Sequence, residues 1–140
     1  MADYQTINIY GVQPSQFFIS KAKLEAVQSW FDPADLSNFD PIPIKMLDGQ
    51  PVSTDGHTRC VAAMLQGMRD IPFVWENDEL DWEMYRRCVI ACKERNVFSI
   101  ADLRERIISA AEYEIKWDRW CDKMQEEVEA ERKHSLLTDF

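Results

Sequence analysis

Short stretches in which hydrophobic and polar residues alternate occupy much of the first half of the chain, and this spacing is typical of β-strands. The predicted strands are residues 6–12, 42–47, 50–54 and 71–75. Asp48-Gly49, between the second strand and the third, is a strong signal for a two-residue hairpin turn. Because proline cannot donate a hydrogen bond to a sheet, Pro43 predicts that its strand lies towards a sheet edge, at least where it begins.

Helical spacing of apolar residues predicts the elements between these strands. Ser20 is a suitable N-cap for a helix to about Phe31, and the following Asp32-Pro33 ends it. A polar connection with one helical turn is expected over residues 35–41. A second, short helix is predicted from His57 to about Gly67, where glycine suits a helix C-terminus.

The second half of the chain is predicted to be helical throughout. We expect one helix that Asp81 caps and residues 96–98 end, a second over residues 100–108, and a third from Ser109 or Ala110 towards residue 133. Apolar residues of the third helix recur with a helical period and predict a core-facing stripe: Tyr113, Trp117, Trp120, Cys121, Met124 and Val128.

These elements predict an α+β fold in which helices pack on a small mixed β-sheet, followed by a helical C-terminal extension. A chain of 140 residues is long enough to bury a substantial core as one compact unit. We expect a core of residues 1–76 and a helical extension of residues 77–140 packed on it.

The turn into the helix at His57 has the composition of an anion site. Gly56 tolerates the backbone angles that a sharp strand-to-helix turn needs. A helix N-terminus offers amide donors and a positive dipole end, to which Thr58 adds a hydroxyl and Arg59 a guanidinium shaped for phosphate. In the alternative interpretation, Asp55 caps the helix and Arg59 pairs with a carboxylate elsewhere.

The segment Gly56-His57-Thr58-Arg59-Cys60-Val61-Ala62 resembles the G-x-x-R-x-x-A signature of the ParB/sulfiredoxin-like superfamily. The resemblance extends over residues 5–76, including the strands on both sides of the signature and the Ile71-Pro72-Phe73-Val74 passage back into the sheet. It implies a ParB/sulfiredoxin-like fold and a phosphate-bearing ligand, a nucleotide with Mg²⁺, held by Gly56, His57, Thr58 and Arg59.

The chain departs from that family at two positions. His57 stands where sulfiredoxins carry the cysteine on which their chemistry depends, so peroxiredoxin repair is not supported. Thr58 stands where ParB proteins carry the first of two arginines that contact nucleotide phosphates. Only Arg59 remains of that pair, and a weaker phosphate affinity or a different anion is therefore expected.

The segment Asp55–Arg59 also resembles the D-G-x-x-R form found in relatives that act as small-molecule kinases. This resemblance implies phosphoryl transfer, with Asp55 or His57 as the catalytic base. The alternatives are a helix cap for Asp55 and a packed or hydrogen-bonded turn residue for His57.

Charge and composition narrow the choice of partners. The net charge is −9, with eight acidic and five basic residues in 1–75 and seventeen and eleven in 76–140. Without a basic footprint, direct DNA binding is not expected. No apolar run of ~20 residues predicts a membrane helix, and no signal peptide is visible, so a cytoplasmic location without membrane contact is expected.

Two groups of residues contain potential metal ligands. The four cysteines, Cys60, Cys88, Cys92 and Cys121, lack C-x-x-C spacing and are interpreted as buried free thiols. The acidic residues 76–81 could hold a divalent cation, but a solvated loop that caps the next helix is the preferred interpretation. No metal site in the protein is predicted.

The leading functional hypothesis is a phosphate-binding protein, with nucleotide as the expected ligand and phosphoryl transfer as an additional activity. A second hypothesis is a non-catalytic interaction or regulatory module with a degenerate phosphate loop, whose helical half, residues 81–133, docks a partner protein or a second copy of the chain as a homodimer. Trp117 and Trp120 could mediate this self-association if they are exposed. A third is a nuclease, which the negative charge disfavours.

Overall fold

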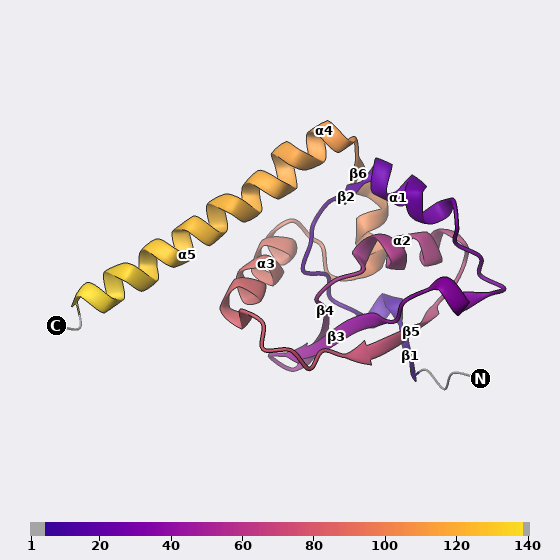
Figure 1. Cartoon of the computed structure of the whole chain (residues 1–140), viewed down its shortest axis with the longest axis horizontal. Helices are drawn as coiled ribbons and strands as arrows, with labels where there is room; N and C mark the ends of the chain where they lie inside the picture. The colour runs from indigo at the N-terminus through magenta and orange to yellow at the C-terminus, as the bar shows by residue number, and fades with distance from the viewer. Residues whose placement is uncertain (1–4, 139–140) are drawn as a thin grey trace.

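The computed structural model describes residues 5–138, and their fold is of the α+β class (Figure 1). A mixed sheet has the strand order β1-β5-β3-β4, in which β5 and β3 are parallel and the other two pairs are antiparallel. Its strands are β1 Gln5–Asn8, β3 Ile42–Leu47, β4 Gln50–Ser53 and β5 Asp70–Trp75. The fold class predicted from the sequence is confirmed.

The predicted hairpin joins β3 and β4. Asp48 and Gly49 have φ angles of 52° and 85°, so both take the left-handed conformation that a type I′ hairpin turn requires. The predicted edge position of Pro43 holds where β3 begins, because pairing with β4 starts only at Ile44, although the rest of β3 lies between β5 and β4. Proline is tolerated here because it stands near the start of β3, opposite Thr54, where β4 has already ended.

Helices cover both faces of the sheet. The helix α1 spans Lys21–Gln28 and begins at Ser20, whose hydroxyl accepts from the amide of Lys23 as predicted; α2 spans His57–Leu65. Successive side chains of a strand alternate between faces. Ile42 and Ile44 accordingly lie in the main core with α2, whereas Leu47 packs with Val52 of β4 and with Val89 of α3 (Trp82–Glu94).

The helical half begins with α3, Trp82–Glu94, capped by the side chain of Asp81 as predicted. The predicted long third helix is also present: α4 (Ala110–Tyr113) leads through one π-helical turn (Glu114–Asp118) into α5 (Arg119–Thr138). Figure 1 shows α5 as a long helix on the side of α3 that faces away from the sheet. Tyr113, Trp117, Met124 and Val128 are buried, and Trp120 and Cys121 are partly buried against them, which confirms the predicted stripe.

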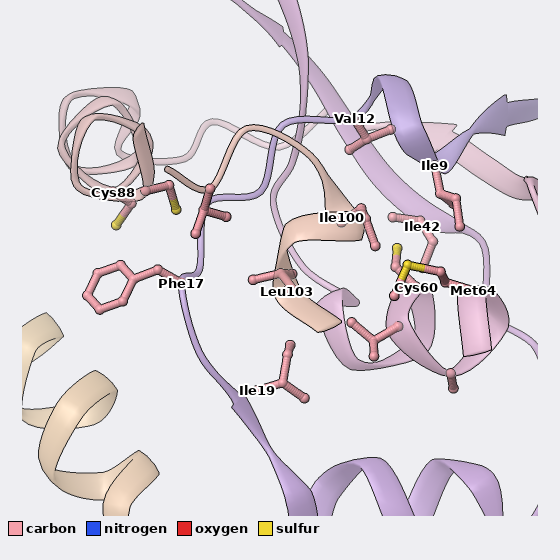
Figure 2. Packing of buried hydrophobic residues seen from close by; sticks show 14 of the residues in the cluster. Ile9, Val12, Phe17, Ile19, Ile42, Cys60, Met64, Cys88, Ile100 and Leu103 are labelled. Carbon is pink, nitrogen blue, oxygen red and sulfur yellow. The ribbon is translucent and has the colours of Figure 1, made fainter. Parts of the chain in front are cut away.

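Three short segments form 3₁₀ turns: Ile9–Gly11, Leu36–Asn38 and Ile100–Glu105. The first corrects the predicted strand 6–12, which ends at Asn8 because the Asn8 side chain accepts from the amide of Tyr10 and starts the turn. The third corrects the predicted helix 100–108. Ile100 and Leu103 from this turn are fully buried on the side of Ile42 and Cys60 (Figure 2).

After that turn, β6 (Ile107–Ile108) pairs in parallel with β2 (Ile19–Ser20). The prediction that the strand at residues 71–75 is the last one is therefore wrong. A pairing between residues so distant in sequence leaves no local hydrophobic pattern. Across residues 5–138, no helix has the length and apolar character needed to cross a membrane.

Candidate functional site

The turn from β4 into α2 depends on Gly56. This residue is the N-cap of α2 and has φ 77° and ψ 19°, in the left-handed region. A Cβ atom at this position would lie 2.7 Å from Cδ1 of Ile42 and 2.8 Å from Nη2 of Arg59. The positive φ favours glycine here, and the space without a Cβ atom is filled by the side-chain ends of Ile42 and Arg59.

The guanidinium of Arg59 folds back over this turn. Among the described residues it forms no ion pair and no hydrogen bond, and its Nε is buried without an acceptor. A buried donor that lacks a partner costs about 1–3 kcal/mol. The alternative interpretation, in which Arg59 pairs with a carboxylate elsewhere, does not hold for the described residues.

The start of α2 differs from that of the neighbouring helices. Side chains of Ser20, Asp81 and Ser109 cap α1, α3 and α4, whereas no side chain caps α2. Asp55 does not cap α2. The amides of the first turn of a helix have no intrahelical acceptor. The amide donors at the start of α2 therefore remain available to another group.

A cavity of about 260 Å³ lies at this N-terminus. The residues that line it come from four parts of the chain: Gln16, Lys23, Val27, Asp55, Gly56, His57, Thr58, Arg59 and Tyr113. Lys23 and Arg59 are cationic, and Asp55 is the single acidic residue in this lining. The ammonium of Lys23 lies 4.8 Å from the centre of the Tyr113 ring. We call this cavity the anion cavity.

His57 lies inside the turn rather than in the opening of the anion cavity. It is 4% exposed, and its Nε2 accepts hydrogen bonds from the Ser15 amide (3.0 Å) and, because this nitrogen is then unprotonated, from the Ser53 hydroxyl (3.0 Å). Burial lowers the pKa of His57 to about 4, although Asp55 acts to raise it. The lone pair of Nε2 is thus already used, and the imidazole fixes Ser15 beside the end of β4.

Asp55 has the opposite environment. Its side chain is exposed, and it makes no hydrogen bond or ion pair to another described residue. Of the two predicted bases, Asp55 is therefore the one whose oxygen atoms remain available to a ligand. The turn before it is held by Tyr85, whose hydroxyl donates to the Thr54 carbonyl (3.1 Å).

Two of the acidic residues after β5, Glu76 and Asp81, bind groups of the protein itself. Glu76 accepts from the Thr54 hydroxyl (3.3 Å) and from the Asp78 amide (3.2 Å). Asp81 caps α3 and accepts two hydrogen bonds from Arg132 of α5. Among residues 5–138, no group of three or more His, Cys, Asp or Glu side chains is placed to hold a metal ion.

The cysteines are poor nucleophiles in this fold. All four are free thiols, and three are buried. Burial raises the pKa of Cys60, Cys92 and Cys121 to about 12 and that of Cys88 to about 11. Because the thiolate is the reactive form, thiol chemistry at neutral pH is disfavoured.

The residues of the turn could be predicted from the sequence, whereas those that reach the turn from other segments could not. Gln16, Lys23 and Tyr113 line the anion cavity but belong to other segments. The Tyr113 hydroxyl accepts from Nε2 of Gln16 (3.0 Å), a contact across 97 positions. The helical period of residues 113–128 placed Tyr113 in the core, but no local signal indicated that it also borders a cavity.

No family model and no curated protein matches the chain. Among solved structures, it is similar to two mutants of a free serine kinase, one in complex with AMP and one with ADP, each at 20% identity and TM-score 0.44 over 54% of this chain and 32% of that one. It is also similar to protein Atu1540 from Agrobacterium tumefaciens, at 17% identity and TM-score 0.43 over 67% of this chain and 49% of that one. The chain thus covers less than half of each of these proteins. The resemblance to the ParB/sulfiredoxin-like superfamily stays a prediction.

Proposed function

We propose that this protein binds a phosphate-bearing ligand, a nucleotide, in the anion cavity at Asp55–Arg59. The observation that carries the proposal is the guanidinium of Arg59, which lies over the uncapped N-terminus of α2 with no anionic partner among the described residues. A phosphate there would give the guanidinium its missing acceptor and would accept from the first amides of the helix.

The roles within the cavity follow from these positions. Arg59 supplies a charged fork, Lys23 a second positive charge, and Thr58 a hydroxyl. Gly56 lets the backbone approach the phosphate, and His57 contributes through its main-chain amide while its ring holds the turn. If Mg²⁺ accompanies the nucleotide, Asp55 is the carboxylate of this cavity that would hold it, since Mg²⁺ binds through one or two carboxylates and the phosphates of the ligand.

Phosphoryl transfer is the catalytic form of this proposal, and the free carboxylate of Asp55 favours it. Asp55 would take the proton of an acceptor hydroxyl while that oxygen bonds to the terminal phosphorus and the bond from phosphorus to the leaving oxygen breaks. The unprotonated Nε2 of His57 is occupied by two donors, so we assign His57 a positioning role.

The test is a thermal-shift and calorimetric screen of inorganic phosphate, AMP, ADP and ATP, with and without Mg²⁺. Saturation at about 100 times the dissociation constant should stabilise the fold by about 2.7 kcal/mol, and Arg59→Ala should remove most of this gain. The matched control is Arg69→Ala, because Arg69 is an exposed arginine outside the anion cavity. The proposal fails if no phosphate compound binds, or if Arg59→Ala binds as tightly as the wild type.

A further inference from the structure

A second cavity, of about 330 Å³, lies between the same turn and the helical half. It is bordered by Gln16, Asp55 and His57, which also border the anion cavity. The remaining walls come mainly from α3 and from the long helix that contains α5. We call it the interhelical cavity. The two cavities thus share a wall, in which Asp55 is the exposed residue.

The walls of the interhelical cavity are largely apolar. Met84, Trp117 and Met124 contribute side chains, as do Cys88 and Cys121, whose thiols stay protonated because burial raises their pKa. Such a lining suits a flat hydrophobic or aromatic group, with a few polar atoms to orient it.

Most polar groups at this cavity already have partners. The Tyr85 hydroxyl donates to the Thr54 carbonyl, and Asp81 accepts from Arg132. Asp55 and Gln125 make no side-chain hydrogen bond to a described residue, so they remain able to bind a ligand. Both charged residues of this lining, Asp55 and Asp81, are acidic. A second anionic group would therefore be repelled here, whereas a neutral or cationic one is accommodated.

We infer that the interhelical cavity receives the organic part of the phosphate ligand, and that this part is a neutral or cationic aromatic ring system. A hydroxyl or amino group between the ring system and the phosphate donates a hydrogen bond to Asp55. This inference rests on the proposed function, because it assumes that the phosphate occupies the anion cavity. The inferred ligand carries its negative charge at one end only, as a nucleoside monophosphate does. Ligand sites usually have volumes of about 300–1,000 Å³, and the interhelical cavity, at about 330 Å³, lies within this range.

Three probes test the inference on the wild-type chain by calorimetry: inorganic phosphate, AMP and 3-phosphoglycerate. AMP should bind at least ten times more tightly than inorganic phosphate, because its base and ribose fill the interhelical cavity. The carboxylate of 3-phosphoglycerate would face Asp55 and Asp81, so this compound should bind no more tightly than inorganic phosphate.

A pair of variants on α5 tests the location. Gln125→Trp places a large side chain at the interhelical cavity and should weaken AMP about tenfold without changing the affinity for inorganic phosphate. Glu126→Trp is the matched control, since Glu126 is the exposed neighbour of Gln125 and borders neither cavity, and it should leave both affinities unchanged.

The outcomes separate the two proposals. If inorganic phosphate binds but AMP and 3-phosphoglycerate bind equally well, the inference is wrong and the anion site stands. The same holds if Gln125→Trp folds and binds AMP like the wild type. If none of the three probes binds, both the inference and the proposed function are wrong.

Discussion

His57 and Arg59 are two positions apart on α2 and face different surroundings. The imidazole is buried and accepts from Ser15 and Ser53, which ties the N-terminal segment to the end of β4. The guanidinium instead lies over Gly56 and lacks any acceptor among the described residues. One side chain therefore stabilises the turn, and the other is left available for a ligand.

The buried His57 predicts a specific dependence of stability on pH. Its pKa is lowered from 6.5 to about 4 in the folded protein, so between these values the unfolded chain binds the proton more readily. Stability should therefore fall as the pH drops from 6.5 to 4, by about 3 kcal/mol in total. The measurement is urea unfolding across this pH range.

His57→Gln is the comparison for this prediction, because its amide oxygen can accept a hydrogen bond and does not titrate. The variant is expected to be less stable at pH 7 but to show a flatter pH profile, with the carboxylates contributing equally to both proteins. Parallel profiles for wild type and variant would show that His57 is not held neutral by the fold.

At the scale of the element, the beginning of α2 could be predicted from the sequence, as could the beginnings of α1 and α3. The signature residues 56–59, the glycine turn and the apolar face of α2 could all be predicted because each depends on local backbone geometry or on a helical period. The predicted hairpin was confirmed for the same reason. The strand β6 and the 3₁₀ turn Ile100–Glu105 could not be predicted, since burial of Ile100 and Leu103 and pairing with β2 depend on distant segments.

The start of α2 gives a prediction at this scale. Gly56→Ala should destabilise the protein by roughly 1–3 kcal/mol, because alanine is strained at a φ of 77° and its Cβ would collide with Ile42 and Arg59. Arg59 would have to move, so binding of inorganic phosphate should be lost as well. Denaturant unfolding and calorimetry measure the two effects.

Gly67→Ala controls for the backbone strain alone. Gly67 also has a positive φ, of 84°, but no atom lies within 4 Å of where its Cβ would be. This variant should lose some stability and keep its affinity for phosphate. If the two variants lose equal stability and equal affinity, the close approach of Arg59 to Gly56 has no functional role.

At the scale of the whole molecule, Phe17 joins the two halves of the chain. Its ring meets those of Trp117 and Trp120 edge-on, at centroid distances of 4.9 Å and 5.0 Å, and the guanidinium carbon of Arg95 lies 4.1 Å from its centre. Because Trp117 is buried and Trp120 partly buried in this contact, the sequence-based suggestion that they mediate self-association finds no support.

The aromatic contact around Phe17 predicts a single cooperative unit. Phe17→Ala should cost about 3–5 kcal/mol, and unfolding followed by circular dichroism and by tryptophan fluorescence should coincide in both wild type and variant. Phe98→Ala is the control, since Phe98 is 55% exposed and should change stability by less than about 0.5 kcal/mol. Two separate transitions in the wild type would show that residues 1–76 and 77–140 fold independently.

The candidate site as a whole depends on this union of the two halves. The turn at Asp55–Arg59 could be predicted from its own residues, but Lys23, Tyr113 and the walls of the interhelical cavity are brought to it by long-range packing. A local sequence pattern predicts the secondary structure of a segment but not which other segments pack against it.

Binding of a phosphate at the start of α2 can be measured in an amide ¹H–¹⁵N spectrum of the labelled protein titrated with AMP. We predict that the largest saturable shifts fall on the amides of Gly56, His57, Thr58 and Arg59, because these donors lie at the start of α2 and receive the phosphate. Absence of saturable shifts at these four amides, or shifts confined to other segments, would show that the phosphate does not bind at the start of α2.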